Sequence, residues 1–346
     1  MKKVMIGMSG GVDSSVAAAL LKNQGYEVVG ATMRLWKYPE AEGFREIDKE
    51  IGRAKEVCDH LGIEHIVLDF SAEFRDTVVK NFIEEYSKGR TPNPCIVCNK
   101  KLKFGLMFER AMELGFDYIA TGHYARIEKC TDGYHLLESA ASGKDQSYVL
   151  YNCTQEILAK TLMPLSSYTK EEVRHMAAEL KLPTREAPES MEICFVPNDD
   201  YKAFLLEYAG LIPKEGDMLD SDGNVIGRHK GVMNYTIGQR KGLGAYGRPM
   251  FVMNINPGNN TVMLGEKGME FSSELVGGDL NVISGGELPK RCALKVRYQA
   301  KPAMAEIRVE GDKVYAKFDE PQRAVTPGQA VVFYDGDEVL GGATVL

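Results

Sequence analysis

The sequence predicts an α/β protein with a Rossmann-like parallel sheet in its first half and a β-rich second half. Two observations predict this arrangement. Through about residue 125, short apolar runs alternate with helical periodicities, as in successive strand–helix–strand units. After Leu211 the texture changes to short β-branched stretches punctuated by glycine, and from Leu280 onward apolar and polar residues alternate at spacings typical of a small β-barrel.

The expected elements follow from these periodicities. The parallel strands are predicted at 4–8, 28–33, 65–70 and 118–121, and the helices at 14–23, 47–61, 72–87, 102–114, 146–160, 170–181 and 199–209. Later strands are predicted at 224–226, 251–255, 261–264, 293–298, 305–309, 313–318, 330–334 and 338–344. We therefore expect a catalytic domain at 1–210, a central β-rich domain at 211–275 and a β-barrel domain at 276–346.

Composition limits the class of protein. Hydrophobic residues make up 44% and charged residues 26% of the 346, which is ordinary for a globular chain, and no apolar run is long enough to cross a bilayer. The amino terminus has no signal-peptide pattern, so we expect a cytoplasmic protein without a membrane partner. The net charge of −7 argues against coating of nucleic acid by the whole surface and restricts such binding to local patches.

A glycine-rich segment from Gly7 to Ser15 follows a predicted strand and opens a predicted helix. In that context backbone amides and the helix dipole can hold phosphate. Gly10 and Gly11 let the backbone approach the ligand, and Asp13 can hold Mg²⁺. The segment lacks the lysine that ends a Walker A loop. It therefore predicts a phosphate-binding loop of another kind.

The seven cysteines are too few and too scattered for a disulfide framework. Cys95 and Cys98 lie close together in a proline-containing loop, which we expect just before a helix whose amino-terminal dipole would lower a thiol pKa. One such pair is half of a four-cysteine zinc site, so zinc is a minor alternative. Cys194 also falls in a predicted loop, where functional residues are frequent. The others are expected to be buried (Cys58, Cys153, Cys292) or in a turn (Cys130).

The Ser9–Ser14 segment, Ser-Gly-Gly-Val-Asp-Ser, resembles the signature of the adenine-nucleotide alpha-hydrolase superfamily, the ATP pyrophosphatases. This resemblance implies that ATP adenylates a carbonyl oxygen while the loop binds the departing pyrophosphate. Met33 and Gly122, at predicted strand ends, would lie near the adenosine. The implied ATP-binding residues are Gly7, Met8, Ser9, Gly10, Gly11, Val12, Asp13, Ser14, Met33 and Gly122.

Motifs along nearly the whole chain resemble the bacterial tRNA-specific 2-thiouridylase family; they lie at 91–100, 120–124, 143–147, 190–197, 235–240 and 297–298. The resemblance implies that ATP adenylates oxygen 2 of the wobble uridine, position 34, in tRNAs for Lys, Glu and Gln, and that sulfur then replaces this oxygen. Cys194 would carry a persulfide, and Cys98 would be the nucleophile that releases the sulfur and ends in a disulfide with Cys194. A sulfur-relay protein or cysteine desulfurase is the implied donor.

One position departs from the best-known form of the family, which has Asp where this chain has Cys95. Cys95, Cys98 and Cys194 together could ligate three irons of a 4Fe–4S cluster and leave the fourth iron open to hydrosulfide. The alternative is that Cys95 only lines the pocket. The sequence leaves both possibilities open.

The resemblance also implies a set of residues that contact tRNA: Asn93, Pro94, Cys95, His123, Lys144, Asp145, Gln146, Arg297, Tyr298 and Gln329. From the residues alone, Lys144 to Gln146 could equally be a solvated helix start, His123 a structural histidine and Gln329 a turn residue. Two acid-free basic stretches, 228–248 and 290–301, favour RNA contact, with Tyr235, Tyr246 and Tyr298 as stacking surfaces.

Two other functions share part of this pattern. Another ATP pyrophosphatase, acting on a small-molecule carbonyl, would have the phosphate loop but no need for the three cysteines or the basic β-rich half. A non-catalytic iron–sulfur module that binds nucleotide and RNA would not release pyrophosphate. Pyrophosphate release that depends on unmodified tRNA distinguishes the 2-thiouridylase from both.

Overall fold

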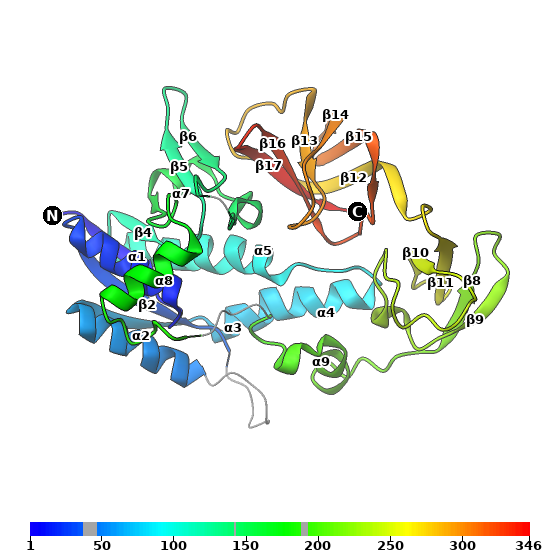
Figure 1. Ribbon diagram of the computed structural model, residues 1–346, viewed down its shortest axis with the longest axis horizontal. Coiled ribbons are helices and arrows are strands. Elements are labelled where there is room, and N and C mark those ends of the chain that lie inside the picture. Colours follow the sequence, from blue (N-terminus) through cyan, green and yellow to red (C-terminus); the bar gives the residue numbers. More distant parts are fainter. Residues whose placement is uncertain (37–46, 142, 188–192) are drawn as a thin grey trace.

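The computed structural model describes residues 1–36, 47–141, 143–187 and 193–346 (Figure 1). Its first sheet contains β1 (Lys3–Gly7), β2 (Glu27–Arg34), β3 (Glu64–Asp69), β4 (Tyr118–Ala120) and β7 (Thr161–Leu162), in the order β3-β2-β1-β4-β7. All neighbouring pairs are parallel. The predicted Rossmann-like sheet is therefore confirmed.

Both faces of this sheet are covered, because β1 sends Val4 and Ile6 into one hydrophobic cluster and Met5 into another. On the first face lie α1 (Val12–Asn23), α2 (Ile47–Leu61) and α8 (Lys170–Glu179). On the second lies a continuous helical segment composed of α5 (Pro94–Cys98), η2 (Asn99–Leu106) and α6 (Met107–Glu113).

A second helical segment packs beside α5 and η2, and the two lie side by side beneath the barrel in Figure 1. It consists of α3 (Ser71–Phe74), η1 (Arg75–Val79) and α4 (Lys80–Ser87), with η4 (Pro197–Asp199) and α9 (Tyr201–Glu207) following Cys194 in the chain. Phe82, Leu102 and Phe195 belong to the hydrophobic cluster that these helices share. The segment that contains Cys194 is thus anchored against the helix that contains Cys98.

The single helix expected at 146–160 was wrong. The structure has two short helices there, η3 (Ser147–Leu150) and α7 (Gln155–Ala159). Thr154 separates them because its backbone is extended, which interrupts the helix. Its side chain caps α7 by accepting from the Ile157 amide. The hairpin formed by β5 (Arg126–Lys129) and β6 (Tyr134–Leu137) was not predicted at all.

The central part forms a four-stranded sheet of β8 (Gly216–Leu219), β9 (Val225–His229), β10 (Met250–Asn256) and β11 (Thr261–Glu266), in the order β10-β11-β8-β9, with η5 (Val232–Asn234) between β9 and β10. The barrel contains β12 (Phe271–Val282), β13 (Arg291–Lys295), β14 (Ala303–Glu310), β15 (Lys313–Arg323), β16 (Ala330–Asp335) and β17 (Glu338–Val345). It closes where β12 pairs with β17. The predicted β-rich second half is confirmed.

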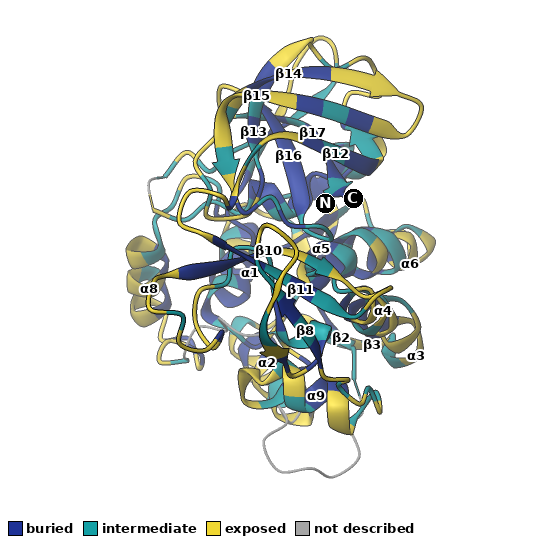
Figure 2. Ribbon diagram, turned by 90° about the vertical axis from the view of Figure 1, so that its right-hand side faces the viewer, coloured by how far each residue is buried: buried dark blue, intermediate teal, exposed yellow. Residues whose placement is uncertain are grey.

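Burial distinguishes the two sides of the barrel (Figure 2). β14 alternates buried and exposed residues, as expected for a strand with one solvated face, whereas β16 is buried along nearly its whole length. The neighbouring strand β17 pairs with β6 of the hairpin, so the barrel sheet continues into the amino-terminal part of the chain. The barrel is therefore joined to the catalytic half by backbone hydrogen bonds.

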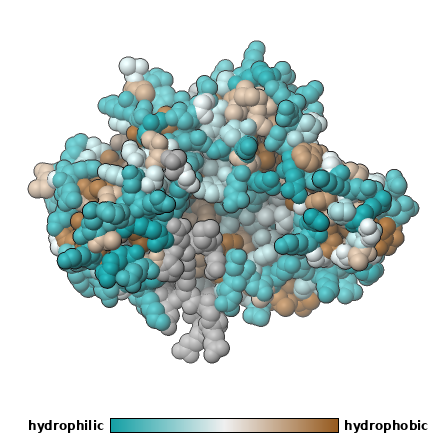
Figure 3. Space-filling model, in the orientation of Figure 1, coloured by the Kyte–Doolittle hydropathy of each residue, from teal (hydrophilic) through white to brown (hydrophobic). Residues whose placement is uncertain are grey.

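The face seen in Figure 3 is mostly hydrophilic, with apolar side chains scattered over it. Among the described residues, no helix combines the length and the apolar character needed to span a membrane.

Candidate active site

The phosphate loop is the turn between β1 and α1. Ser14 shapes it: its hydroxyl accepts from the Ser9 amide at 3.3 Å and donates to the Gly11 carbonyl at 3.2 Å. Ser15 donates to the same carbonyl at 2.8 Å and accepts from Thr184 at 2.9 Å. The first amides of α1 consequently face a small, hydroxyl-lined turn, as an anion site at a helix terminus requires.

Two glycines allow close packing at this turn. Gly10 has φ of +69°, and a Cβ there would lie 2.8 Å from the Glu50 carbonyl oxygen. A Cβ on Gly122, just after β4, would lie 2.8 Å from the Ser14 amide nitrogen and 2.9 Å from the Asp13 carbonyl carbon. Backbone cannot yield at such distances, so Gly122 is required for the end of β4 to contact the start of α1.

The remaining residues predicted to bind ATP differ in what they offer. Met8 and Val12 have buried side chains in the core beneath the loop, so only their backbone groups are available. Gly7 ends β1. Met33, near the end of β2, is half-buried and packs against two hydrophobic clusters.

Asp13 is the charged centre of the loop. Its carboxylate accepts from Lys170 at 2.6 Å, from Tyr124 at 2.8 Å and from Lys144 at 3.3 Å. Burial alone would raise the pKa of Asp13, but the hydrogen bond from Lys170 and the charge of Lys144 outweigh it, so the pKa lies below its ordinary value. Two lysines from distant segments therefore stand where phosphate would arrive.

The thiols lie on and beside α5. Asn93 caps this helix by accepting from the Ile96 amide at 3.3 Å, and the buried Pro94 begins it. The helix thus starts before both cysteines, so the prediction that they precede a helix was wrong. Cys95 is exposed at its first turn and Cys98 is buried one turn later.

The structure brings the segments of the predicted thiols together, because Cys98 and the neighbours of Cys194, Ile193 and Phe195, belong to one hydrophobic cluster. Burial raises the pKa of Cys98 to about 11, while the charge of Lys103 acts in the opposite direction. Cys194 is exposed on one side, yet surrounding protein still desolvates its sulfur, and its pKa rises to about 12. The expectation that the helix dipole lowers a thiol pKa was therefore wrong for Cys98, since burial dominates.

The loop at 143–147 lies against the phosphate loop. Lys144 contacts Asp13, as described, and lies over the Tyr124 ring, 4.8 Å from its centroid. The Asp145 carboxylate accepts from the Ser139 amide and the Ser147 hydroxyl, and Gln146 accepts from the Tyr124 amide. The side chains of Asp145 and Gln146 hold the loop in shape and leave Lys144 pointing at Asp13.

Residues of the barrel reach both loops. Tyr298, which is 43% exposed, donates from its hydroxyl to the Asp145 carbonyl at 2.6 Å. Gln329 donates to the Thr91 carbonyl at 2.8 Å, two residues before the α5 cap. Gly328, with φ of +89°, touches the Thr91 backbone so closely that a Cβ would lie 3.0 Å from the carbonyl oxygen. These barrel residues therefore hold in place the segment that leads into α5, the helix that contains Cys95 and Cys98.

Comparisons with known proteins place the chain. Family models match it over residues 2–198 (tRNA methyl transferase HUP domain), 202–266 (tRNA methyl transferase PRC-barrel domain) and 272–345 (aminomethyltransferase beta-barrel domain). The tRNA-specific 2-thiouridylase MnmA of Carboxydothermus hydrogenoformans is 50% identical, covering 99% of this chain and 97% of the relative. The same enzyme of Clostridioides difficile is 49% identical, with 99% and 98% covered. The chain belongs to the tRNA-specific 2-thiouridylase family.

One solved structure that resembles part of the chain is more distant than these relatives. The U34-tRNA thiolase NcsA of Methanococcus maripaludis, with its 4Fe–4S cluster, shares 19% identity and a TM-score of 0.38 over 61% of this chain and 65% of that one. A likeness this low carries no argument about the site.

One residue of this 2-thiouridylase family member was missed from the sequence: Lys170, which was assigned only to a helix. Lys103 stands out in the sequence only as part of a basic patch with Arg90, Lys100 and Lys101, and its action on Cys98 and Cys194 was not predicted. Tyr124 was named only within a motif, although its hydroxyl reaches Asp13. The absence of a lysine in the phosphate loop was the available signal, because the phosphates of ATP require cations from elsewhere in the chain.

The other residues predicted to contact tRNA differ in how far they are exposed. His123 is buried and accepts or donates at 2.8 Å to Thr121; burial, followed by the charges of Lys103 and Lys144, lowers its pKa well below the ordinary value. Arg297 is exposed. Tyr235 is buried in the core of the central sheet and Tyr246 is half-buried, so the expected stacking surface at 228–248 was wrong for Tyr235.

The basic stretches are also partly neutralised by acids from neighbouring strands. Arg228 pairs with Asp217 at 2.9 Å, and Arg248 pairs with Glu266 at 2.7 Å. In the second stretch Arg291 pairs with Asp319 at 2.7 Å, whereas Arg297 and Lys301 are exposed at its far end. Exposed cations of this stretch therefore lie close to Tyr298 in the chain.

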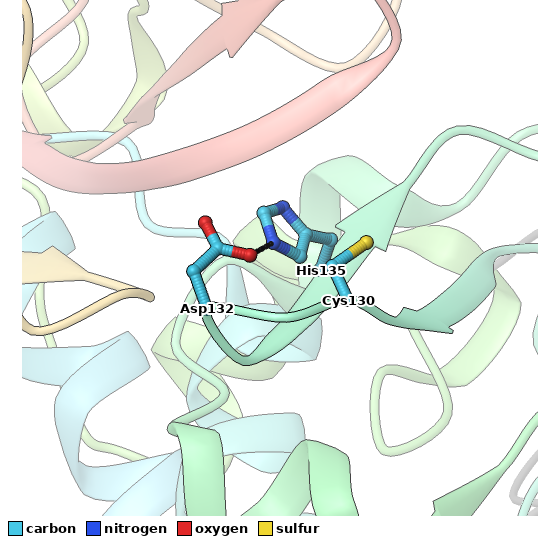
Figure 4. A group of neighbouring side chains, drawn as sticks. All are labelled: Cys130, Asp132 and His135. Atoms are coloured by element: carbon cyan, nitrogen blue, oxygen red, sulfur yellow. Dashed lines mark hydrogen bonds and ion pairs between the residues drawn. The ribbon is translucent and has the colours of Figure 1, made fainter.

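Among the described residues, one group of three potential metal ligands has all its ligand atoms within 4.8 Å: Cys130, Asp132 and His135 (Figure 4). Both ring nitrogens of His135 are already occupied, by Asp132 at 3.0 Å and by Glu338 of β17 at 2.6 Å. These carboxylates, Asp132 foremost, raise the pKa of His135. The contacts of His135 with Asp132 and with Glu338 tie the hairpin to the barrel and account for the arrangement without a metal ion.

Proposed function

We propose that the protein catalyses ATP-dependent 2-thiolation of the wobble uridine, position 34, in tRNAs for Lys, Glu and Gln. The observation that carries this proposal is the arrangement around His123. Lys103, from the helix that contains Cys98, and Lys144, from the loop at 143–147 that contacts Asp13 of the phosphate loop, both act on this buried imidazole. A nucleotide site and a nucleophilic thiol site therefore adjoin, as a reaction that adenylates an oxygen and then replaces it with sulfur requires.

The adenylation half takes place at the phosphate loop. The uridine oxygen 2 attacks the α-phosphorus of ATP, the bond to the β-phosphate breaks, and pyrophosphate leaves. Lys144 and Lys170, which contact Asp13 in the free protein, would turn to the phosphates as they arrive. Asp13 would then be available to Mg²⁺, since carboxylate and hydroxyl oxygens are the ligands this ion prefers.

The sulfur half takes place at the thiols. The terminal sulfur of a Cys194 persulfide attacks carbon 2 of the uridine, and AMP leaves with the oxygen. The Cys98 thiolate then attacks the Cys194 sulfur, the bond to the transferred sulfur breaks, and its electron pair stays with the nucleobase as a thiocarbonyl. A Cys98–Cys194 disulfide remains, and a dithiol reductant must reduce it with two electrons before the next turnover.

The sulfur arrives from outside this chain. We propose a sulfur-relay protein or a cysteine desulfurase as the donor, because Cys194 is the exposed member of the thiol pair. We place the reaction in the cytoplasm, where its tRNA substrates are found and where thiols remain reduced.

A cluster-based route is the second candidate, and Cys95 favours it. Cys95, Cys98 and Cys194 interact electrostatically but do not belong to a group with ligand atoms within 4.8 Å among the described residues, which argues against a single metal ion. A 4Fe–4S cluster needs more widely spaced thiolates, and these three would hold it, with the open iron binding hydrosulfide. Anaerobic purification with iron and sulfide assays, using Cys95→Ala as control, decides between the routes: iron-free protein with full activity excludes the cluster.

The proposed function is tested by combining purified protein with ATP and unmodified tRNA for Lys, Glu or Gln. We expect pyrophosphate release that depends on the tRNA and, with a sulfur donor and reductant, 2-thiouridine at position 34 by mass spectrometry. Pyrophosphate release with a small amide donor and no tRNA would contradict the proposal.

A further inference from the structure

The helix that contains Cys98 changes its winding immediately after this residue. From Asn99 to Leu106 the backbone forms the π-helix η2, and the Met107 amide donates to the Leu102 carbonyl, five residues earlier. An α-helix makes this bond to the fourth residue. π-helical turns are rare in proteins, and those that occur are often found at functional sites. The wide turn therefore points to side chains that the site needs in a particular direction.

The wide turn determines where Lys103 lies relative to Cys98. In an α-helix, residues five apart lie about 140° apart around the axis. In a π-helix, where each amide bonds to the carbonyl five residues earlier, two residues five apart lie closer to the same side of the helix. Gly105 belongs to this geometry, because a Cβ there would lie 3.1 Å from the Lys100 carbonyl oxygen. The π-turn thus turns Lys103 toward the side of the helix where Cys98 lies.

The surroundings of Lys103 agree with this direction. The side chain is half-buried, and its charge acts on Cys98, on Cys194 and on His123. Neighbouring Lys100 is paired with Asp279 at 2.7 Å, whereas Lys103 forms no ion pair within the described ranges 1–36, 47–141, 143–187 and 193–346. The charge of Lys103 is therefore not compensated by a carboxylate among the described residues.

We propose that Lys103 is a positioning residue for sulfur transfer, placed by the π-turn to stabilise negative charge on the sulfurs of Cys98 and Cys194. The inference rests on the proposed function, in which the Cys98 thiolate attacks the Cys194 sulfur. During that exchange one negative charge is spread over the attacking, central and leaving sulfurs. Burial disfavours such an anion, and the helix dipole weakens beyond the first turn, so a nearby cation has to compensate.

The experiment measures thiol reactivity directly, without ATP or tRNA. Iodoacetamide labels the full-length reduced protein at one near-neutral pH, and peptide mass spectrometry gives the labelling rates of Cys98 and Cys194. We expect Lys103→Met to slow labelling of Cys98 by about tenfold, and Lys103→Arg to restore most of the rate. Lys101→Met is the matched control, because Lys101 is exposed on the same turn.

Gly105→Ala is a second variant, which keeps the lysine but adds a methyl group against the π-turn. We expect it to slow labelling by a smaller factor, and melting temperatures establish that each variant is folded. Unchanged labelling in Lys103→Met, or an equal loss in Lys101→Met, would overturn the inference. If labelling behaves as expected but the wild type releases no pyrophosphate with unmodified tRNA, the proposed function fails while the role of Lys103 in thiol reactivity stands.

Discussion

At the phosphate loop two lysines converge on one carboxylate, whereas at the thiol pocket one lysine faces two thiols and has no carboxylate partner among the described residues. In the first arrangement both lysines already have a carboxylate partner before ligand binds, so phosphate has to exchange partners with Asp13. In the second the lysine has no such partner, so its charge is available to any sulfur that becomes negative. The difference separates a site that binds an anion from one that generates an anion.

The largest expected effect comes from Gly122→Ala, which breaks only the first region. Its Cβ would lie 2.8 Å from the Ser14 amide nitrogen and push the loop amides out of place. We expect tRNA-dependent pyrophosphate release to fall on the order of 1,000-fold, with iodoacetamide labelling of Cys98 unchanged. Gly52→Ala is the control, because a Cβ there meets no atom within 4 Å. Equal losses in both variants would contradict this role for Gly122.

Lys170→Met should have the next largest effect. It removes the shorter of the two lysine contacts to Asp13, 2.6 Å against 3.3 Å, and with it one cation for the departing pyrophosphate. We expect pyrophosphate release to fall about 100-fold. Lys55→Met breaks an exposed lysine–aspartate pair of 2.7 Å and should change little. If Lys170→Met released pyrophosphate at the wild-type rate, Lys170 would only pair with Asp13 in the free protein and would have no role in the reaction.

The pH dependence of stability tests the ion pairs of Asp13 in the free protein. The pKa of Asp13 is lowered in the folded protein, so its contribution to stability is present above its ordinary pKa of 3.8 and is lost as the pH falls through the lower native value. Melting temperatures of wild type and Asp13→Asn should therefore differ at pH 6 and converge only as the pH falls below 3.8 through the lower native pKa of Asp13. A difference that persists unchanged in acid would contradict the ion-pair account.

The smallest expected effect is that of Gln329→Ala, which loosens the contact between the barrel and the thiol helix. The variant loses the 2.8 Å hydrogen bond to the Thr91 carbonyl, worth about 1 kcal/mol. We expect 2-thiouridine formation to slow severalfold and pyrophosphate release to change less. Gln322→Ala removes a comparable bond to the Glu320 carbonyl at the surface of the barrel and is the matched control. If Gln329→Ala slowed pyrophosphate release as much as 2-thiouridine formation, Gln329 would not act on the thiol region alone.

Local features of the fold could be predicted because they depend on contiguous residues. The helix expected at 47–61 has the same bounds as α2, and the phosphate loop lies between a strand and a helix as its glycines and serines indicate. Cys58, Cys153 and Cys292 are buried as predicted. Each of these follows from periodicity or from a short motif.

Features that depend on tertiary packing could not be predicted. Lys170 reaches Asp13 only because α8 packs on α1, 157 residues away in sequence. Tyr235 has the composition of a stacking residue but completes the core of the central sheet. The π-turn after Cys98 leaves no mark in the periodicity except Gly105, and its effect on Lys103 depends on the pocket that Cys194 completes from another segment.

The central claim is that the phosphate loop adenylates while the thiols deliver sulfur, and a single-turnover reaction of Cys98→Ser tests it most directly. Unmodified tRNA, ATP and a sulfur donor are mixed with the variant, and pyrophosphate and 2-thiouridine are measured in the same quenched samples. The account predicts about one equivalent of pyrophosphate per tRNA bound and no 2-thiouridine. Wild-type amounts of 2-thiouridine, or loss of pyrophosphate together with 2-thiouridine, would contradict it.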